Sequence, residues 1–221
     1  AVPDLRAAVQ LLGRLRAATG DLVTSFEFLP RIAVEFTTQH IPGVTAPLAG
    51  THANYVLCEV STARDDPALR PLLEQGLADA LAQGLVNDAV IAESIAQRQA
   101  LWKLRESVPE AQRHEGASIK HDVSVPVASL PAFLERASAA VRAIVPAGRL
   151  VAYGHVGDGN LHFTLSQPVG ADPREFLAHT HALETAVYAI VREFRGSISA
   201  EHGIGQLKRA ELAHHRSATD L

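Results

Sequence analysis

The segment that most constrains this chain is a nine-residue motif, Gly154 to His162, in which two histidines flank a turn. Its Asp158-Gly159 pair is a favoured two-residue hairpin turn, because type I′ geometry needs positive φ at both central positions. With that pair at the tip, His155 lies opposite His162, and directly opposed side chains lie about 5 Å apart on one sheet face. The motif therefore predicts two imidazoles that share one divalent metal ion. Two surface histidines beside a turn are the alternative.

Composition limits the class of protein. The chain has 221 residues, 47% of them hydrophobic, which suits one large domain or two small ones. Its net charge is −4 and its basic residues are not clustered, so nucleic acid and anionic membranes are not expected partners. Its apolar runs are too short to span a bilayer, and its single cysteine, Cys58, fits a reducing, cytoplasmic compartment. The abrupt ends of the sequence indicate a fragment of a longer chain.

Hydrophobic periodicity divides the chain into alternating helices and strands. The expected helices are 3–18, 30–40, 69–81, 95–102, 130–144 and 176–191, and a polar segment spans 105–115. The expected strands are 22–28, 55–60, 86–92, 118–125, 150–156, 161–165 and 197–199. The second half has the order β-α-β-β-α-β of a ferredoxin-like unit, and the first half adds strands to the same antiparallel sheet. We predict one α+β domain with helices on one face of the sheet and the other face free.

A second motif, residues 199–209, follows the last expected strand. Glu201 and His202 lie there beside two glycines, which let the backbone approach a neighbour closely. The final strand of a ferredoxin-like sheet lies near the hairpin, so Glu201 is a candidate third ligand for the histidine pair. Two histidines, a carboxylate and an open position are typical of a catalytic metal site, with zinc favoured over manganese or iron. An exposed acid beside a helix-capping histidine is the alternative.

The two motifs, Gly-His-Val-Gly-Asp-Gly-Asn-Leu-His (154–162) and Ser-Ala-Glu-His-Gly-Ile-Gly (199–205), carry a resemblance to a known family. Together they resemble the C-terminal part of FAD-linked oxidases of the vanillyl-alcohol oxidase superfamily. The similarity is greatest to D-2-hydroxyglutarate dehydrogenases, D-lactate dehydrogenases and the FAD-binding subunit of glycolate oxidase. It runs from Phe26-Glu27-Phe28 to Lys208-Arg209. The resemblance implies that residues 1–221 form the substrate, or cap, domain and that the N-terminal FAD-binding domain is absent.

By position, the resemblance implies a set of functional residues. They are the metal ligands His155, His162 and Glu201, the catalytic base His202, the substrate-binding cations Arg105 and Lys120, and Asn160 at the boundary between substrate and flavin. An ion pair with Glu106 or Glu110 is the alternative role for Arg105. A pair with Asp122 is the alternative for Lys120, because the two residues share a strand face.

The implied reaction is the oxidation of a D-2-hydroxy acid to the 2-oxo acid. The metal orients the substrate's carboxylate and hydroxyl, His202 takes the hydroxyl proton, and the α-hydrogen leaves as hydride to FAD. Arg105 suits bidentate recognition of the carboxylate. Four residues after this arginine the 2-hydroxyglutarate enzymes carry threonine, whereas this chain has Pro109. Proline has no side-chain donor, which argues against 2-hydroxyglutarate as the substrate.

Two other functions use the same residues. A metal-binding or ligand-binding module without redox chemistry fits the fold, because ferredoxin-like domains host many functions. A metal-dependent hydrolase would use Glu201 or His202 to activate water. If the family resemblance holds, the chain alone is expected to be inactive and to contact the FAD-binding domain of the same polypeptide. Its open sheet face would also allow the fragment to form a homodimer.

Overall fold

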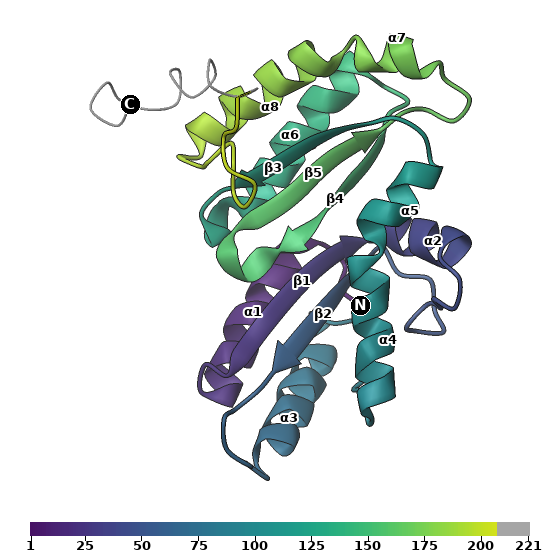
Figure 1. Cartoon of the computed structure of the whole chain (residues 1–221). Coiled ribbons are helices and arrows are strands. Elements are labelled where there is room, and N and C mark those ends of the chain that lie inside the picture. The colour runs from purple at the N-terminus through teal and green to yellow at the C-terminus, as the bar shows by residue number, and fades with distance from the viewer. Residues whose placement is uncertain (207–221) are drawn as a thin grey trace.

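The computed structural model describes residues 1–206, which form a five-stranded antiparallel sheet with helices on both faces (Figure 1). The strand order is β2-β1-β4-β5-β3. The strands are β1 (Val23–Pro30), β2 (Asn54–Val60), β3 (Ser118–Ser124), β4 (Arg149–His155) and β5 (Asn160–Ser166). The predicted α+β class and the single extended antiparallel sheet are therefore confirmed. Within the described range, no helix is long and apolar enough to cross a membrane.

The second half of the chain has the predicted ferredoxin-like arrangement. Strand β5 lies between β3 and β4 and is antiparallel to both, while α6 (Leu130–Ile144) and α8 (Thr180–Glu193) pack against each other. The single helix expected at 176–191 is divided, because α7 (Pro173–Leu177) ends before α8 begins. The prediction of a strand at 197–199 was wrong, because among the described residues this segment forms only one isolated bridge, between Ser124 and Ser197. Lys208-Arg209, at the end of the second motif, lie outside the described residues.

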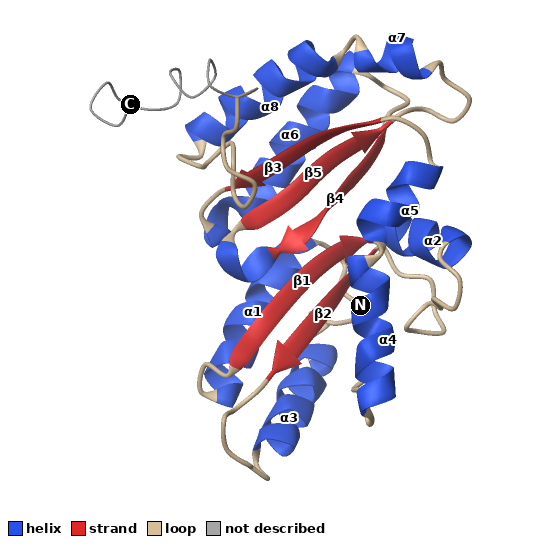
Figure 2. Ribbon diagram, in the orientation of Figure 1, coloured by secondary structure: helices blue, strands red, loops and turns tan. Residues whose placement is uncertain are grey.

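The main core lies under one face of the sheet, covered by α1 (Leu5–Thr19), α3 (Leu69–Ala82), α6 and α8 (Figure 2). Helix α1 illustrates the local sequence signals. Asp4 caps its first turn by accepting a hydrogen bond from the Ala7 backbone N–H at 2.8 Å, and Gly20 ends it in the left-handed conformation. Its leucines recur at helical spacing and are buried in this core. The expected packing of these helices is confirmed.

Helices also cover part of the opposite face, so the prediction that helices lie on one face only was wrong. They are α2 (Arg31–His40), α4 (Ile95–Glu106) and α5 (Val108–His114), and the polar segment 105–115 belongs to the last two. They bury a second apolar cluster that includes Phe36, Leu104, Val151 and Tyr153. Apolar residues on that face of β1, β2 and β4 had to be removed from water, and these three helices do so. On β3 and β5 this face of the sheet is more polar, and it carries Asp122 and His162, which lie directly opposite each other.

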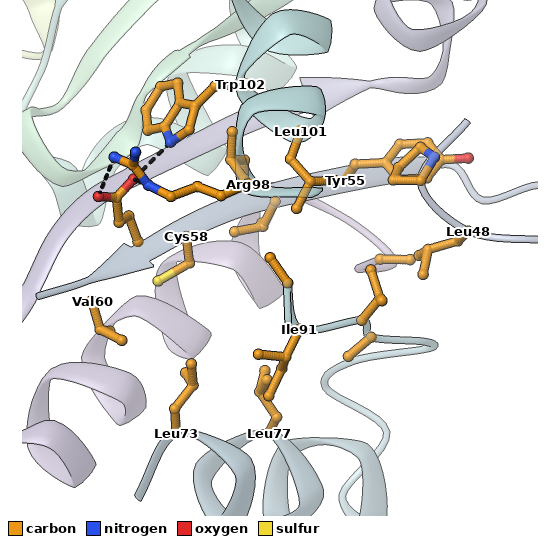
Figure 3. A pocket seen from close by; sticks show the side chains of 18 of the residues that line it. Leu48, Tyr55, Cys58, Val60, Leu73, Leu77, Ile91, Arg98, Leu101 and Trp102 are labelled. Atoms are coloured by element: carbon orange, nitrogen blue, oxygen red, sulfur yellow. Dashed lines mark hydrogen bonds and ion pairs between the residues drawn. The ribbon is translucent and has the colours of Figure 1, made fainter. Parts of the chain in front are cut away.

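Residues 86–92 do not form the predicted strand. The N-terminal residues lie between this segment and β2 instead. The Val2 backbone N–H donates to the Asn54 carbonyl of β2 at 3.0 Å, and the Asn87 backbone N–H donates to the Ala1 carbonyl at 2.9 Å. Beyond this point an apolar cavity of about 710 Å³ separates β2 from the segment (Figure 3). Side chains of β2, α3 and α4 line it, and the two histidines of the hairpin do not.

The hairpin between β4 and β5 has a different register from the predicted one. His162 lies opposite Tyr153, whereas His155 pairs with Glu27 of β1. The connection is a single 3₁₀ turn over Val156–Asp158, closed by Gly159 in the left-handed conformation. The last residues of β4 separate from β5 and pair with β1 instead. A turn motif in the local sequence could not predict this long-range pairing. Because the shift is two residues and side chains alternate with period two, both histidines keep the predicted face.

Gly159 is the turn position at which a side chain is excluded, and this is testable by substitution. Its φ is +73°, and an added Cβ would lie 2.1 Å from the Val125 carbonyl oxygen. We expect Gly159→Ala to lower the free energy of unfolding by about 2 kcal/mol or more, since strain and a backbone clash act together. Urea denaturation followed by circular dichroism measures the change.

Gly157 provides the matched control, because it lies in the same turn and an added Cβ would meet nothing within 4 Å. Gly157→Ala is expected to change the free energy of unfolding by less than about 0.5 kcal/mol. Equal stability of the two variants would contradict the observed turn.

Candidate active site

Three predicted ligands converge at the hairpin. The ring centroids of His155 and His162 are 5.7 Å apart. Nε2 of His155 lies 2.9 Å from Oε1 of Glu201, and Nε2 of His162 lies 4.0 Å from Oε2 of the same carboxylate. One ligand atom from each residue lies within 4.8 Å of the other two. Two imidazoles and a carboxylate at these separations have the chemistry of a divalent metal site.

A buried acid lies behind His155. Glu27 directs Oε1 toward Nδ1 of His155 at 2.5 Å, and its Oε2 accepts a hydrogen bond from Nε of Arg105 at 2.6 Å. The side chains of Glu27 and Arg105 are only 2% and 8% exposed, so they form a buried ion pair. The Arg105 guanidinium also lies 4.9 Å from the centroid of the Tyr153 ring. These contacts join helix α4 to β1 at the edge of the cluster formed by His155, His162 and Glu201.

A second acid, Asp122 of β3, holds the segment that carries Glu201 and His202. Its Oδ2 accepts hydrogen bonds from the backbone N–H groups of both residues, at 2.8 and 3.0 Å. The same oxygen lies 3.1 Å from Nδ1 of His202. Oδ1 of Asp122 lies 3.8 Å from Nδ1 of His162. One carboxylate therefore sets the position of the third ligand and the orientation of the predicted base.

Electrostatics suit these roles. Burial opposes ionisation of Glu27, but the hydrogen bond from His155 and the charge of Arg105 outweigh it and lower the pKa of Glu27. Burial likewise opposes ionisation of Asp122, and the two backbone hydrogen bonds outweigh it and lower its pKa. The hydrogen bond to Glu27 raises the pKa of His155, whereas burial lowers the pKa of His162. The lowered pKa values favour the anionic form of both acids and the neutral form of His162, which is the form that binds metals.

The remaining predicted residues lie around this cluster. Arg105 pairs with Glu27, and among the described residues it forms no ion pair with either of the two acids expected as alternatives. Its Nη2 lies 3.4 Å from Nε2 of His155, so the guanidinium borders the site. Asn160 is buried and donates from Nδ2 to Oε1 of Glu201 at 2.6 Å.

Lys120 and His202 are, with Glu201, the exposed members of the predicted set. Lys120 lies on the same face of β3 as Asp122, two residues away, and within the described chain it forms no ion pair with that acid. The side chain of His202 is 71% exposed, and its Nδ1 faces Asp122. With the proton on Nδ1, the ring presents Nε2 as a base toward solvent. Pro109 occupies the first turn of α5, where its missing N–H costs no helical hydrogen bond.

Sequence reasoning missed the roles of Glu27 and Asp122. Glu27 lies between two buried aromatic residues in Phe26-Glu27-Phe28, and Asp122 is buried between His121 and Val123 in β3. Charged side chains are almost never fully buried unless they are paired, so each acid signalled a partner elsewhere in the chain. The partners were not identifiable, because they lie 78 and 128 residues from Glu27 and 79 and 80 residues from Asp122.

Comparison with known proteins agrees with the two motifs. Residues 1–221 match the family described as FAD linked oxidases, C-terminal domain. The chain belongs to this family. The resemblance predicted from the sequence is therefore confirmed at the level of the family.

Three curated relatives illustrate the similarity, and each aligns with nearly the whole of this chain. The D-2-hydroxyglutarate dehydrogenase of Xanthomonas citri pv. viticola is 35% identical over 221 residues, which are 100% of this chain and 45% of the relative. The mitochondrial D-2-hydroxyglutarate dehydrogenase of Arabidopsis thaliana is 33% identical over 217 residues, 98% of this chain and 37% of the relative. A D-2-hydroxyglutarate–pyruvate transhydrogenase of Saccharomyces cerevisiae is 32% identical over 223 residues, 96% and 43% of the respective chains. The chain thus spans less than half the length of these relatives.

Asp122 is expected to control the order of the segment that carries Glu201 and His202. In Asp122→Ala, the backbone N–H groups of these two residues lose a charged acceptor, which is worth roughly 1.5–3 kcal/mol per hydrogen bond. Hydrogen exchange at both amides should therefore accelerate by about 10-fold or more, as measured by mass spectrometry or NMR.

Asp172→Ala is the control, because Asp172 also accepts two backbone N–H groups, at 2.7 and 3.2 Å, but at the start of α7. It should leave exchange at Glu201 and His202 unchanged. Unaltered exchange in Asp122→Ala would show that this acid does not hold the segment.

Proposed function

We propose that this chain is the substrate- and metal-binding domain of a flavin-dependent dehydrogenase that oxidises a D-2-hydroxy acid to the 2-oxo acid. The observation that carries the proposal is the convergence of His155, His162 and Glu201, with Arg105 at the edge of the cluster. Membership of the FAD linked oxidase family supports FAD as the cofactor. The FAD-binding domain would be supplied by another part of the same polypeptide, as the partial coverage of the relatives suggests.

The three ligands fit a divalent ion on chemical grounds. Each histidine has one ring nitrogen near an acid of the protein, Glu27 or Asp122, and directs the other nitrogen toward Glu201. A carboxylate that orients a metal-binding imidazole through a hydrogen bond, as Glu27 does for His155 at 2.5 Å, is a regular feature of metal sites. The donor set suits zinc, and it also accepts manganese or iron. When bound, the ion would act as a Lewis acid on the substrate's hydroxyl and carboxylate.

The protein's own groups supply binding and proton transfer. The Arg105 guanidinium, fixed by Glu27, offers a permanent positive charge to the substrate carboxylate. Lys120, exposed on the same sheet face, offers a second cation. His202, oriented by Asp122, accepts the proton of the substrate hydroxyl at Nε2. FAD supplies the electron-accepting chemistry.

The choice of hydroxy acid is part of the proposal. The curated relatives are named for D-2-hydroxyglutarate, whereas Pro109 removes the side-chain donor expected for its distal carboxylate. D-Lactate and glycolate are the smaller acids implied by the sequence resemblance. A cytoplasmic location and self-association of the isolated domain through its open sheet face stay predictions as well.

Metal binding is testable on the purified 221-residue chain. We expect zinc to bind with one-to-one stoichiometry in isothermal titration calorimetry after treatment with chelator. His162→Ala removes one ligand and should weaken zinc binding by roughly 100-fold or more.

His181→Ala is the matched control, because His181 is exposed on α8 and is not one of the three clustered residues. It should bind zinc as the wild-type chain does. Absence of zinc binding by the wild-type chain would contradict the metal site.

Turnover is testable in the full-length polypeptide that includes the flavin domain. A panel of D-2-hydroxyglutarate, D-lactate and glycolate is mixed anaerobically with the oxidised protein, and flavin reduction is followed by absorbance. His202→Ala should slow reduction by a factor on the order of 100 to 10,000, as loss of a general base does. The isolated 221-residue chain should show no turnover.

His179→Ala, at an exposed position before α8, should leave the rate of flavin reduction unchanged. Reduction of the flavin by none of these acids, or at the wild-type rate in His202→Ala, would contradict the proposed mechanism. Hydrolysis of an ester or amide by the isolated chain would favour a hydrolase instead.

A further inference from the structure

We propose that Glu27 is a positioning residue that holds His155 in its metal-binding tautomer and neutralises Arg105 beside the metal site. This inference rests on the proposed function, because it assigns Glu27 a part in the same site. The catalytic groups remain the ligands, the arginine and His202. Glu27 itself, whose side chain is 2% exposed, acts through the two groups that it contacts.

The hydrogen-bonding geometry of Glu27 fixes the proton on His155. Arginine has only donors, so Oε2 of Glu27 accepts from Nε of Arg105 at 2.6 Å. An ionised carboxylate only accepts, so Nδ1 of His155, 2.5 Å from Oε1, carries the hydrogen in that contact. In the neutral ring, Nε2 then holds the free electron pair. Oε1 of Glu201 also lies near Nε2, but at 2.9 Å it is the more distant of the two acids, and Nη2 of Arg105, which only donates, lies 3.4 Å from the same nitrogen. The single proton of the neutral ring therefore belongs on Nδ1, beside the closer acid Glu27.

The sheet keeps these groups in place. Glu27 lies on β1 between β2 and β4, directly opposite Leu57 on one side and His155 on the other. Directly opposed residues project to the same face of an antiparallel sheet, so Glu27 and His155 are neighbours by register. Phe26 and Phe28, which precede and follow Glu27, are buried in the main core on the opposite face. The carboxylate therefore has little freedom to move away from the ring.

Charge gives Glu27 a second effect on the site. Nη2 of Arg105 lies 3.4 Å from Nε2 of His155, the atom that would bind the ion. A guanidinium that close would repel a divalent cation, because Coulomb repulsion grows as the distance between like charges falls. The buried carboxylate of Glu27 offsets this charge. The arginine is thus able to border both the metal and the substrate carboxylate.

Glu27→Gln separates these effects from packing, because it keeps the shape of the side chain. The amide oxygen accepts from Arg105, which leaves the NH₂ group toward Nδ1 of His155. The ring must then accept at Nδ1 and carry its proton on Nε2, where it blocks metal binding. The Arg105 charge is also left without its counter-ion. Glu27→Asp keeps a charged acceptor, so it should preserve the Nδ1–H tautomer.

The first measurement is the tautomer of His155 in the metal-free protein, read from imidazole nitrogen shifts by NMR at a pH where the ring is neutral. We expect Nδ1–H in the wild-type chain and in Glu27→Asp, and Nε2–H in Glu27→Gln. The second measurement is zinc affinity by calorimetry, which should fall by about 10- to 100-fold in Glu27→Gln and by less in Glu27→Asp.

Glu59→Gln is the matched control. Glu59 lies on the neighbouring strand and also pairs with an arginine, Arg98, at 2.7 Å, while it accepts from Nε1 of Trp102. It has no contact with the histidines, so this variant should keep the tautomer and zinc affinity of the wild-type chain.

The outcomes separate this inference from the proposed function. An Nε2–H ring in the wild-type chain overturns the role of Glu27, and this measurement requires no variant to fold. A folded Glu27→Gln with the wild-type tautomer and zinc affinity overturns it too. If the wild-type chain binds no zinc but its tautomer changes as expected in Glu27→Gln, the positioning of His155 is supported and the proposed metal site fails.

Discussion

The site depends on the buried contact of Glu27 with Arg105 and His155. Removing a carboxylate and a guanidinium from water is costly, and the loss of one partner from such a pair generally costs roughly 3–5 kcal/mol. The pair fastens the end of α4 to the middle of β1, so it joins two elements that are far apart in the sequence. It also places the Arg105 guanidinium, whose charge Glu27 offsets, at the edge of the histidine cluster. The carboxylate of Glu27 therefore contributes both to the packing of α4 on β1 and to the proposed site.

The two faces of the sheet have separate tasks. One face is covered by α1, α3, α6 and α8 and supplies the main core. The other is covered by α2, α4 and α5 over one part, and its polar part carries the site. Two acids on this face, Glu27 and Asp122, each contact an imidazole, His155 and His202 respectively. Hydrogen bonds and nearby charge outweigh burial at both acids and keep them ionised, so they orient the rings without competing for protons.

This arrangement explains why a domain of this kind would depend on a flavin domain. In the proposed function the groups of this chain would bind and deprotonate the substrate, and none of them is an electron acceptor. The relatives are more than twice as long as the matched segment, which agrees with a division of labour between domains. The apolar cavity beside β2 is lined in part by Arg105 but not by His155 or His162, and the proposed function assigns it no role.

The sequence by itself determined the family, the sheet class and the face on which the histidines lie, because alternation along a strand is a local property. Its two motifs also identified His155, His162 and Glu201 as the residues that converge. Only the tertiary structure decided the register of the hairpin, since the end of β4 pairs with β1 rather than with β5. It likewise decided that residues 86–92 are not a strand, because Ala1 and Val2 lie between them and β2. The tertiary structure also decided which residues pair with the buried acids. A charged residue in a buried strand indicates that a partner is required, but that partner is distant in the sequence and becomes adjacent only when the chain folds.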